Sequence, residues 1–95
     1  MNINEYQETI KNFATYNHDL GAFIVPLNIG SCVGALQAKV ANIMNSDSVD
    51  ISQRDKISLA ISLGDILQQV SYMTSELGLT LDEVIALIRA SENKA

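Results

Sequence analysis

The feature that most constrains the fold is a long stretch, residues 52–77, with the pattern of one helix and a signal at each end. Ser52 can cap the first turn, with Asp55 three residues on, and Gly78 supplies the left-handed residue that commonly ends a helix. The apolar residues occupy more than one stripe: Ile57, Ala60, Ile61, Leu63, Ile66, Leu67, Val70 and Met73. We therefore expect this helix to be covered on two sides, by its own domain and by a partner subunit.

Two predicted helices precede this stretch, and strand-like alternation is weak throughout the chain. The first covers residues 4–16, before a polar exit at 17–19 and an apolar connector at 20–26 that we expect to pack under the helices. The second covers residues 26–44, because the fixed φ of a proline suits a first helical position. It ends at the loop signal of residues 45–48.

Gly30 and Gly34 are unfavourable inside the second helix, each by roughly 1 kcal/mol relative to alanine. They can permit the close approach of another helix, since glycine has no β-carbon. Alternatively, Gly30 marks a kink or a late helix start. Both interpretations stay open.

A last helix is predicted after residue 80, where Thr80 and Glu83 form a capping box. Its expected buried stripe consists of Leu81, Val84, Ile85 and Ile88. The polar residues 91–95 form a tail that we expect to fray. Together these patterns predict a single all-α domain over residues 1–95.

The composition indicates a small domain that associates with copies of itself. Of the 95 residues, 47% are hydrophobic and 18% are charged, against a usual charged share of about a quarter. Too few polar residues remain to cover one small domain. We therefore expect a homo-oligomer, a dimer or a tetramer, that buries apolar surface between subunits.

The charge and cysteine content disfavour several classes of partner. A net charge of −5 with only six Lys and Arg residues argues against nucleic acid and against acidic membrane surfaces. No run approaches the roughly 18 apolar residues of a membrane span, and the polar N-terminal residues do not resemble a signal peptide. Cys32 is the only cysteine and cannot form an internal disulfide. These observations predict a cytoplasmic protein.

The order of segments resembles the MazG-like family of nucleotide pyrophosphohydrolases. The resemblance rests on Asn-Ile-Asn-Glu-Tyr-Gln at 2–7, the helix at 27–36, Ser-Leu-Gly-Asp-Ile-Leu at 62–67 and Ser-Glu-Leu-Gly-Leu-Thr-Leu-Asp-Glu-Val at 75–84. It covers nearly the whole chain and is strongest over residues 57–88. It implies an all-α bundle of four to five helices that oligomerises through its long helices, and Mg²⁺-dependent hydrolysis of nucleoside triphosphates to monophosphate and pyrophosphate.

Family members hold Mg²⁺ with a Glu-x-x-Glu pair on one helix and a Glu-x-x-Asp pair on the next, because residues three apart share a helix face. By the resemblance, these positions fall on Cys32, Ala35, Ser62 and Asp65, so only Asp65 keeps a carboxylate. The region 20–44 contains no Asp or Glu that would compensate. We therefore expect no catalytic residues and no resident cofactor, with Asp65 as the only candidate metal ligand.

Six residues form the candidate ligand site, and three of them, Asp65, Ser62 and Cys32, stand at the metal-binding positions that the resemblance implies. The full set is Asp65, Lys39, Ser62, Cys32, Gln69 and Tyr72. Asp65 is interpreted as a pocket carboxylate that accepts hydrogen bonds from a ribose or base, or as a buried acid whose partner is Lys39. Lys39 can bind a phosphate, or it is a solvated residue or the partner of Asp65.

The other candidate residues also have a structural interpretation beside ligand binding. Cys32 is expected to be a small buried thiol, because the only histidine, His18, is distant in sequence and is expected at the surface of a helix end. Gln69 and Tyr72 follow Asp65 by four and seven residues, so they share its face. They can contact a nucleobase or pack at a subunit interface.

Three functions follow. The first is a non-catalytic nucleotide-binding protein that sequesters a nucleotide or cyclic nucleotide; a phage protein that removes a defence signal in an infected bacterial cell is a hypothesis by analogy. The second is a Mg²⁺-dependent pyrophosphohydrolase with altered metal ligands. The third is a helical module that binds or regulates another protein.

Overall fold

The structure is a computed structural model that describes residues 1–46 and 50–93. Its elements are α1 (Ile3–Lys11), the short 3₁₀ helix η1 (His18–Leu20), α2 (Gly21–Met44), α3 (Gln53–Glu76) and α4 (Leu81–Asn93). The described residues contain no strand, so the predicted all-α class is confirmed.

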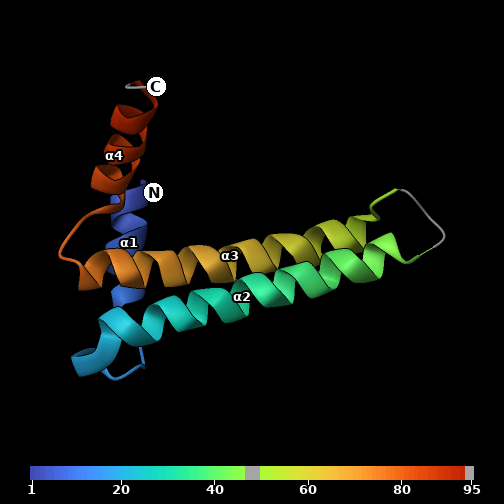
Figure 1. Cartoon of the computed structure of the whole chain (residues 1–95), viewed down its shortest axis with the longest axis horizontal. Helices are drawn as coiled ribbons and strands as arrows, with labels where there is room; N and C mark the ends of the chain where they lie inside the picture. The colour runs from blue at the N-terminus through green and yellow to red at the C-terminus, as the bar shows by residue number, and fades with distance from the viewer. Residues whose placement is uncertain (47–49, 94–95) are drawn as a thin grey trace.

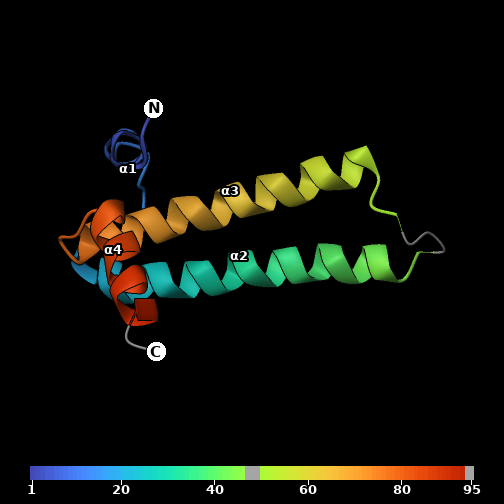
Figure 2. The ribbon, with the colours of Figure 1, turned by 90° about the horizontal axis from the view of Figure 1, so that it is seen from above.

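Helices α2 and α3 form a long antiparallel hairpin, and α1 and α4 lie across one end of it, where α2 begins and α3 ends (Figure 1). Viewed at right angles, the rest of the hairpin extends away from α1 and α4 (Figure 2). The Cα radius of gyration is 15.9 Å, whereas a compact chain of this length has about 12 Å. The fold is therefore an extended hairpin with a small packed head.

The predicted start and stop signals of α3 and the predicted start signal of α4 are confirmed. The Ser52 side chain accepts a hydrogen bond from the Asp55 N–H, and Gly78 has a φ of 72° directly after α3. Thr80 and Glu83 bond to each other's backbone N–H groups, at 3.2 and 3.1 Å. These signals depend on residues within four positions of one another, so the sequence alone determines them.

The predicted bounds of the first two helices need correction. Helix α1 ends at Lys11 rather than at residue 16, because the chain turns there: the Phe13 N–H bonds to the Ile10 carbonyl. Helix α2 begins at Gly21, so the residues expected as a connector at 20–26 are mostly helical. Pro26 lies inside α2 as its sixth residue, beyond the first turn, so its missing N–H leaves the Ala22 carbonyl without a helical hydrogen bond.

Helix α2 continues through Gly30, so a late start at that glycine is wrong. A β-carbon added at Gly30 or Gly34 would meet no heavy atom within 4 Å. Within the described chain, therefore, no helix approaches these two glycines. Asn45 and Ser46 follow α2 as expected of the loop signal, but residues 47–48 lie outside the described residues. At the C-terminus, α4 includes residues 91–93 of the expected tail, and residues 94–95 lie outside.

The apolar core is small and lies in the head. Ile10, Val25 and Tyr72 form it, and the side chains packed against it are Tyr6, Ala14, Tyr16, Ile29 and Met73. The expected buried stripe of α4 is wrong for the chain by itself: Leu81 is buried, but Ile88 is 54% exposed. On α3, Ile61 is likewise 59% exposed. A single chain thus covers only one side of α3.

A buried glutamine connects the helices of the packed head by hydrogen bonds. Gln7 of α1 donates from its amide nitrogen to Ser75 Oγ (2.9 Å) and to the Leu79 carbonyl (3.0 Å). Its amide oxygen accepts from the N–H of Leu81 at the start of α4, at 2.9 Å. One side chain therefore links α1 to the end of α3 and to the beginning of α4.

The segment His18–Met44, which comprises η1 and α2, is long and apolar enough to cross a membrane. The sequence analysis expected no such segment. One helix of this kind is weak support for a membrane span, because core helices and signal sequences have the same length and composition.

Candidate functional site

Two of the predicted site residues, Lys39 and Ser62, are brought together between α2 and α3. The Lys39 ammonium donates to Ser62 Oγ at 2.6 Å and to the Ser58 carbonyl at 3.1 Å. Ser62 is buried and Lys39 is half-buried. These bonds connect the two helices of the hairpin at a point well away from the head.

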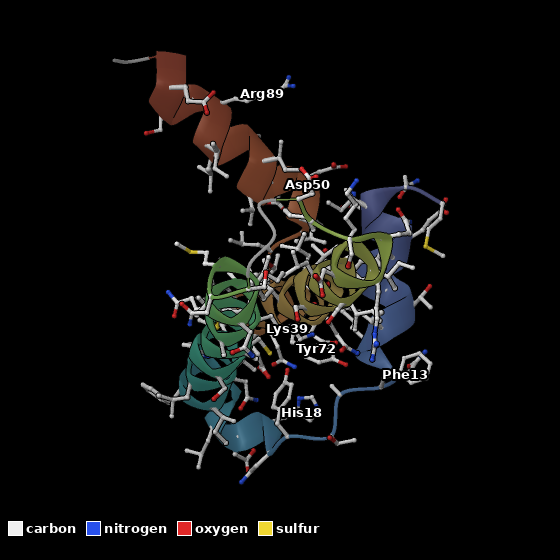
Figure 3. All side chains as sticks on the ribbon, turned by 90° about the vertical axis from the view of Figure 1, so that its right-hand side faces the viewer. Phe13, His18, Lys39, Asp50, Tyr72 and Arg89 are labelled. Carbon is white, nitrogen blue, oxygen red and sulfur yellow. The ribbon has the colours of Figure 1, made fainter. Side chains whose placement is uncertain are left out.

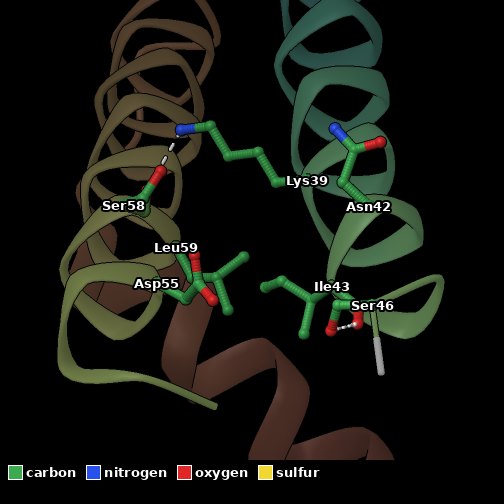
Figure 4. A pocket seen from close by; sticks show the side chains of 7 residues that line it. All are labelled: Lys39, Asn42, Ile43, Ser46, Asp55, Ser58 and Leu59. Carbon is green, nitrogen blue, oxygen red and sulfur yellow. Dashed lines mark hydrogen bonds between the residues drawn. The ribbon is translucent and has the colours of Figure 1, made fainter. Parts of the chain in front are cut away.

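Lys39 reaches across an open cavity of about 220 Å³ (Figure 4). The cavity lies between the C-terminal half of α2 and the N-terminal half of α3, and its walls are Lys39, Asn42, Ile43, Ser46, Asp55, Ser58 and Leu59. Among the described residues, no carboxylate forms an ion pair with Lys39. The one carboxylate of the cavity wall, Asp55, belongs to the first turn of α3.

Asp65 and Cys32 do not join this cavity. Asp65 is exposed on α3, and Lys39 bonds to two serines instead of to Asp65, so the proposed pairing of these two residues is wrong. Cys32 is a half-buried free thiol on α2. Across residues 1–46 and 50–93, no three His, Cys, Asp or Glu side chains are grouped so that they could hold a metal ion.

Gln69 and Tyr72 have different surroundings from each other. The Tyr72 ring is 5% exposed and belongs to the core, and its hydroxyl accepts a hydrogen bond from Gln68, at 2.9 Å. The Gln69 side-chain oxygen is buried and has no hydrogen-bond partner in the described chain. The side chain that donates a hydrogen bond to Tyr72 is therefore Gln68 and not Gln69.

A second cavity, of about 230 Å³, lies beside Tyr72 in the head. Its polar and aromatic walls come from the end of α1, from the segment between α1 and α2, and from the end of α3. The residues are Lys11, Ala14, Tyr16, His18, Tyr72, Ser75 and Glu76. His18 Nδ1 lies 3.3 Å from Glu76 Oε1. The rings of Tyr16 and His18 are 4.6 Å apart, and those of Tyr16 and Tyr72 are 5.7 Å apart. His18 and Tyr72 lie near each other in the view along the hairpin (Figure 3).

Burial and the carboxylate of Glu76 raise the pKa of Tyr16 to about 12, with a smaller effect from Tyr72. Burial, and then Tyr72, also raises the pKa of Tyr6. The Tyr16 hydroxyl is therefore neutral at physiological pH and lies close enough to the Glu76 carboxylate for that group to raise its pKa.

No pattern in the sequence indicated this second cavity. The expected surface position of His18 is confirmed, since the side chain is 64% exposed. The contact of His18 with Glu76 was not expected, because Glu76 lies 58 positions later. The one sequence feature that could have indicated this cavity was the close spacing of Tyr16 and His18 after the first helix.

No family model, no curated protein and no solved structure matches this chain.

Proposed function

We propose that the protein is a non-catalytic binding protein whose Lys39 cavity accepts a phosphate group of a nucleotide or cyclic nucleotide. The observation that carries this proposal is a half-buried ammonium with only neutral partners. An ammonium has three N–H donors, and Ser58 and Ser62 take two of those of Lys39. The third can make a charge-assisted hydrogen bond to a phosphate oxygen.

The cavity also contains an opposing charge. Asp55 lies on its wall and repels an anion. A phosphate is therefore expected on the side of Lys39 and Asn42, with Asp55 weakening its binding. The nucleotide is our first candidate for the ligand because of the resemblance of the hairpin sequence to MazG-like enzymes, which act on nucleotides.

Calorimetry with linear and cyclic nucleotides, without added metal, tests the proposal. Lys39→Gln should weaken binding about tenfold or more, since a hydrogen bond to a charged group contributes about 1.5–3 kcal/mol. Asp55→Asn should strengthen binding. Lys56→Gln removes an exposed lysine of α3 and serves as the matched control for Lys39→Gln.

The outcomes separate nucleotide binding from hydrolysis. No binding by any nucleotide would refute the proposal. Intact nucleotide bound equally well by the Lys39→Gln variant would place the site elsewhere. Metal-dependent release of pyrophosphate that disappears in Asp65→Ala would replace binding with hydrolysis.

We also propose that the hairpin associates with a second copy of the chain. The accessible surface is 6891 Å², whereas a compact protein of 10.3 kDa exposes about 5,400 Å². The excess, about 1,500 Å², is larger than the roughly 800 Å² that each partner contributes to a standard interface. Many exposed side chains of the hairpin are apolar. They include Phe23, Leu27, Val40, Met44, Ile57, Ile61, Leu63 and Leu67.

Light scattering after size exclusion tests this association. Ile61→Lys should convert the oligomer to monomer, whereas Ala90→Lys, at an exposed position of α4, should not. A wild-type monomer that binds an apolar dye would favour the second candidate function, a helical module for another protein. Sedimentation of the wild-type protein with lipid vesicles would assign the apolar faces to a membrane instead.

A further inference from the structure

The head cavity contains a carboxylate with unused hydrogen-bonding capacity. Glu76 is mostly buried, with 17% of its side chain exposed. A carboxylate has about four lone-pair sites, and the contacts of Tyr16 and His18 occupy two of them. The contact with His18 is long, at 3.3 Å, and comes from an exposed side chain that can turn away.

The charges around the cavity favour a ligand that donates hydrogen bonds. Lys11, the only Lys or Arg on its wall, is already paired with Glu8, at 2.8 Å. Glu76 therefore faces no lysine or arginine of its own within the described chain, although His18 can share its charge when protonated. An anionic ligand would be repelled, whereas a donor of N–H groups would be attracted.

The aromatic walls favour a flat ligand. Tyr16, His18 and Tyr72 present ring surfaces within one cavity of about 230 Å³. This volume is below the roughly 300–1,000 Å³ of a pocket for a drug-sized molecule. It suits a single planar group that lies against a ring and directs one edge at the carboxylate.

From this geometry we infer that the head cavity is a binding site for a planar group with two adjacent N–H donors, which lies against the aromatic rings while Glu76 accepts both donors. Guanine and guanidinium share this chemistry. A guanine base has the N1–H and the 2-amino group side by side, and a guanidinium offers a similar pair in the geometry that matches a carboxylate.

This site is independent of the proposed phosphate site. Ser62, which contacts Lys39, and Glu76 are 14 residues apart on α3, or about 21 Å along the helix axis. One mononucleotide does not span that distance. Ligands without phosphate therefore test the head cavity alone, whatever happens at Lys39.

Titration calorimetry with guanosine, inosine, adenosine and agmatine tests the inference. Guanosine should bind, and inosine, which lacks the 2-amino donor, should bind about tenfold more weakly. Adenosine should bind no better than inosine. Agmatine, which carries a guanidinium, distinguishes the second source: binding of agmatine without guanosine would assign the site to guanidinium groups.

Variants connect binding to the named residues. Glu76→Gln should weaken binding at least tenfold, whereas Glu92→Gln, which changes an exposed acid of α4, should leave it unchanged. If Glu76→Gln fails to fold, His18→Ala removes an exposed wall of the cavity and should weaken binding several-fold. The inference would be overturned if guanosine and adenosine bound with equal affinity, if the Glu76→Gln and His18→Ala variants bound as well as the wild type, or if neither guanosine nor agmatine bound.

Discussion

Replacing Gln7 with methionine should destabilise the protein by about 2–4 kcal/mol. Methionine has nearly the length and volume of glutamine, so the change removes hydrogen bonds and leaves little empty space. Gln7 is 3% exposed, and so is Leu81, whose N–H would lose its side-chain acceptor. A buried donor or acceptor without a partner costs about 1–3 kcal/mol.

The magnitude follows from the three bonds of Gln7. The buried N–H of Leu81 should contribute the largest share. The Leu79 carbonyl and Ser75 Oγ are partly accessible to water and should contribute less. Since domains are stable by about 5–15 kcal/mol, the loss is a large fraction of the total, and the melting temperature should fall by roughly 10 °C or more.

Urea unfolding followed by far-UV circular dichroism measures this loss, with all proteins at one concentration because association also stabilises the folded state. Glu8→Gln is the control on the same helix: it breaks only the exposed ion pair with Lys11 and should cost less than about 0.5 kcal/mol. A Gln7→Met variant within 0.5 kcal/mol of the wild type would show that the glutamine does not hold the head together.

Two further predictions concern the end of α3 and the tyrosines of the head. Gly78→Ala should cost about 1 kcal/mol, because Gly78 has a φ of 72°, and unfolding in urea measures this cost; an unchanged midpoint would contradict it. The folded-state pKa of Tyr16, about 12, lies above its ordinary value of 10.0, so its stabilising effect is complete below pH 10 and is lost as the pH rises towards 12. The urea midpoint should fall over that range, and Tyr16→Phe should reduce the fall.

The helix signals that could be read from the sequence were those that act over a few residues. Ser52, Thr80 and Gly78 each act on the backbone of their own turn, and the structure confirms all three. The start of α2 was predicted wrongly because Pro26 is the sixth residue of the helix and not its first, which is the position that proline favours. A proline therefore limits where a helix can begin and does not by itself mark the first residue.

The candidate site was less predictable, because it depends on contacts between distant segments. The helical spacing placed Asp65, Gln69 and Tyr72 on one face, but only the packing of α1 and η1 determines what that face meets. Tyr72 is buried in the core while Asp65 is exposed, because α1 and the segment that follows it cover only the last turns of α3. Similarly, the sequence allowed either an acid or a hydroxyl as the partner of Lys39. Only the alignment of α2 against α3 shows that the partners are Ser58 and Ser62.

The two proposed sites differ in how they depend on assembly. The Tyr16 and Glu76 cavity belongs to the head, which has its own core and is complete within one chain. The Lys39 cavity lies farther along the hairpin, between helices whose other faces expose apolar side chains. A second copy packed on the hairpin around Ile61 would change the surroundings of Lys39 more than those of Glu76, which lies 14 residues after Ser62 on α3. Phosphate binding should therefore be lost in an Ile61→Lys monomer if the partner contributes to it, whereas binding of a planar donor in the head should persist.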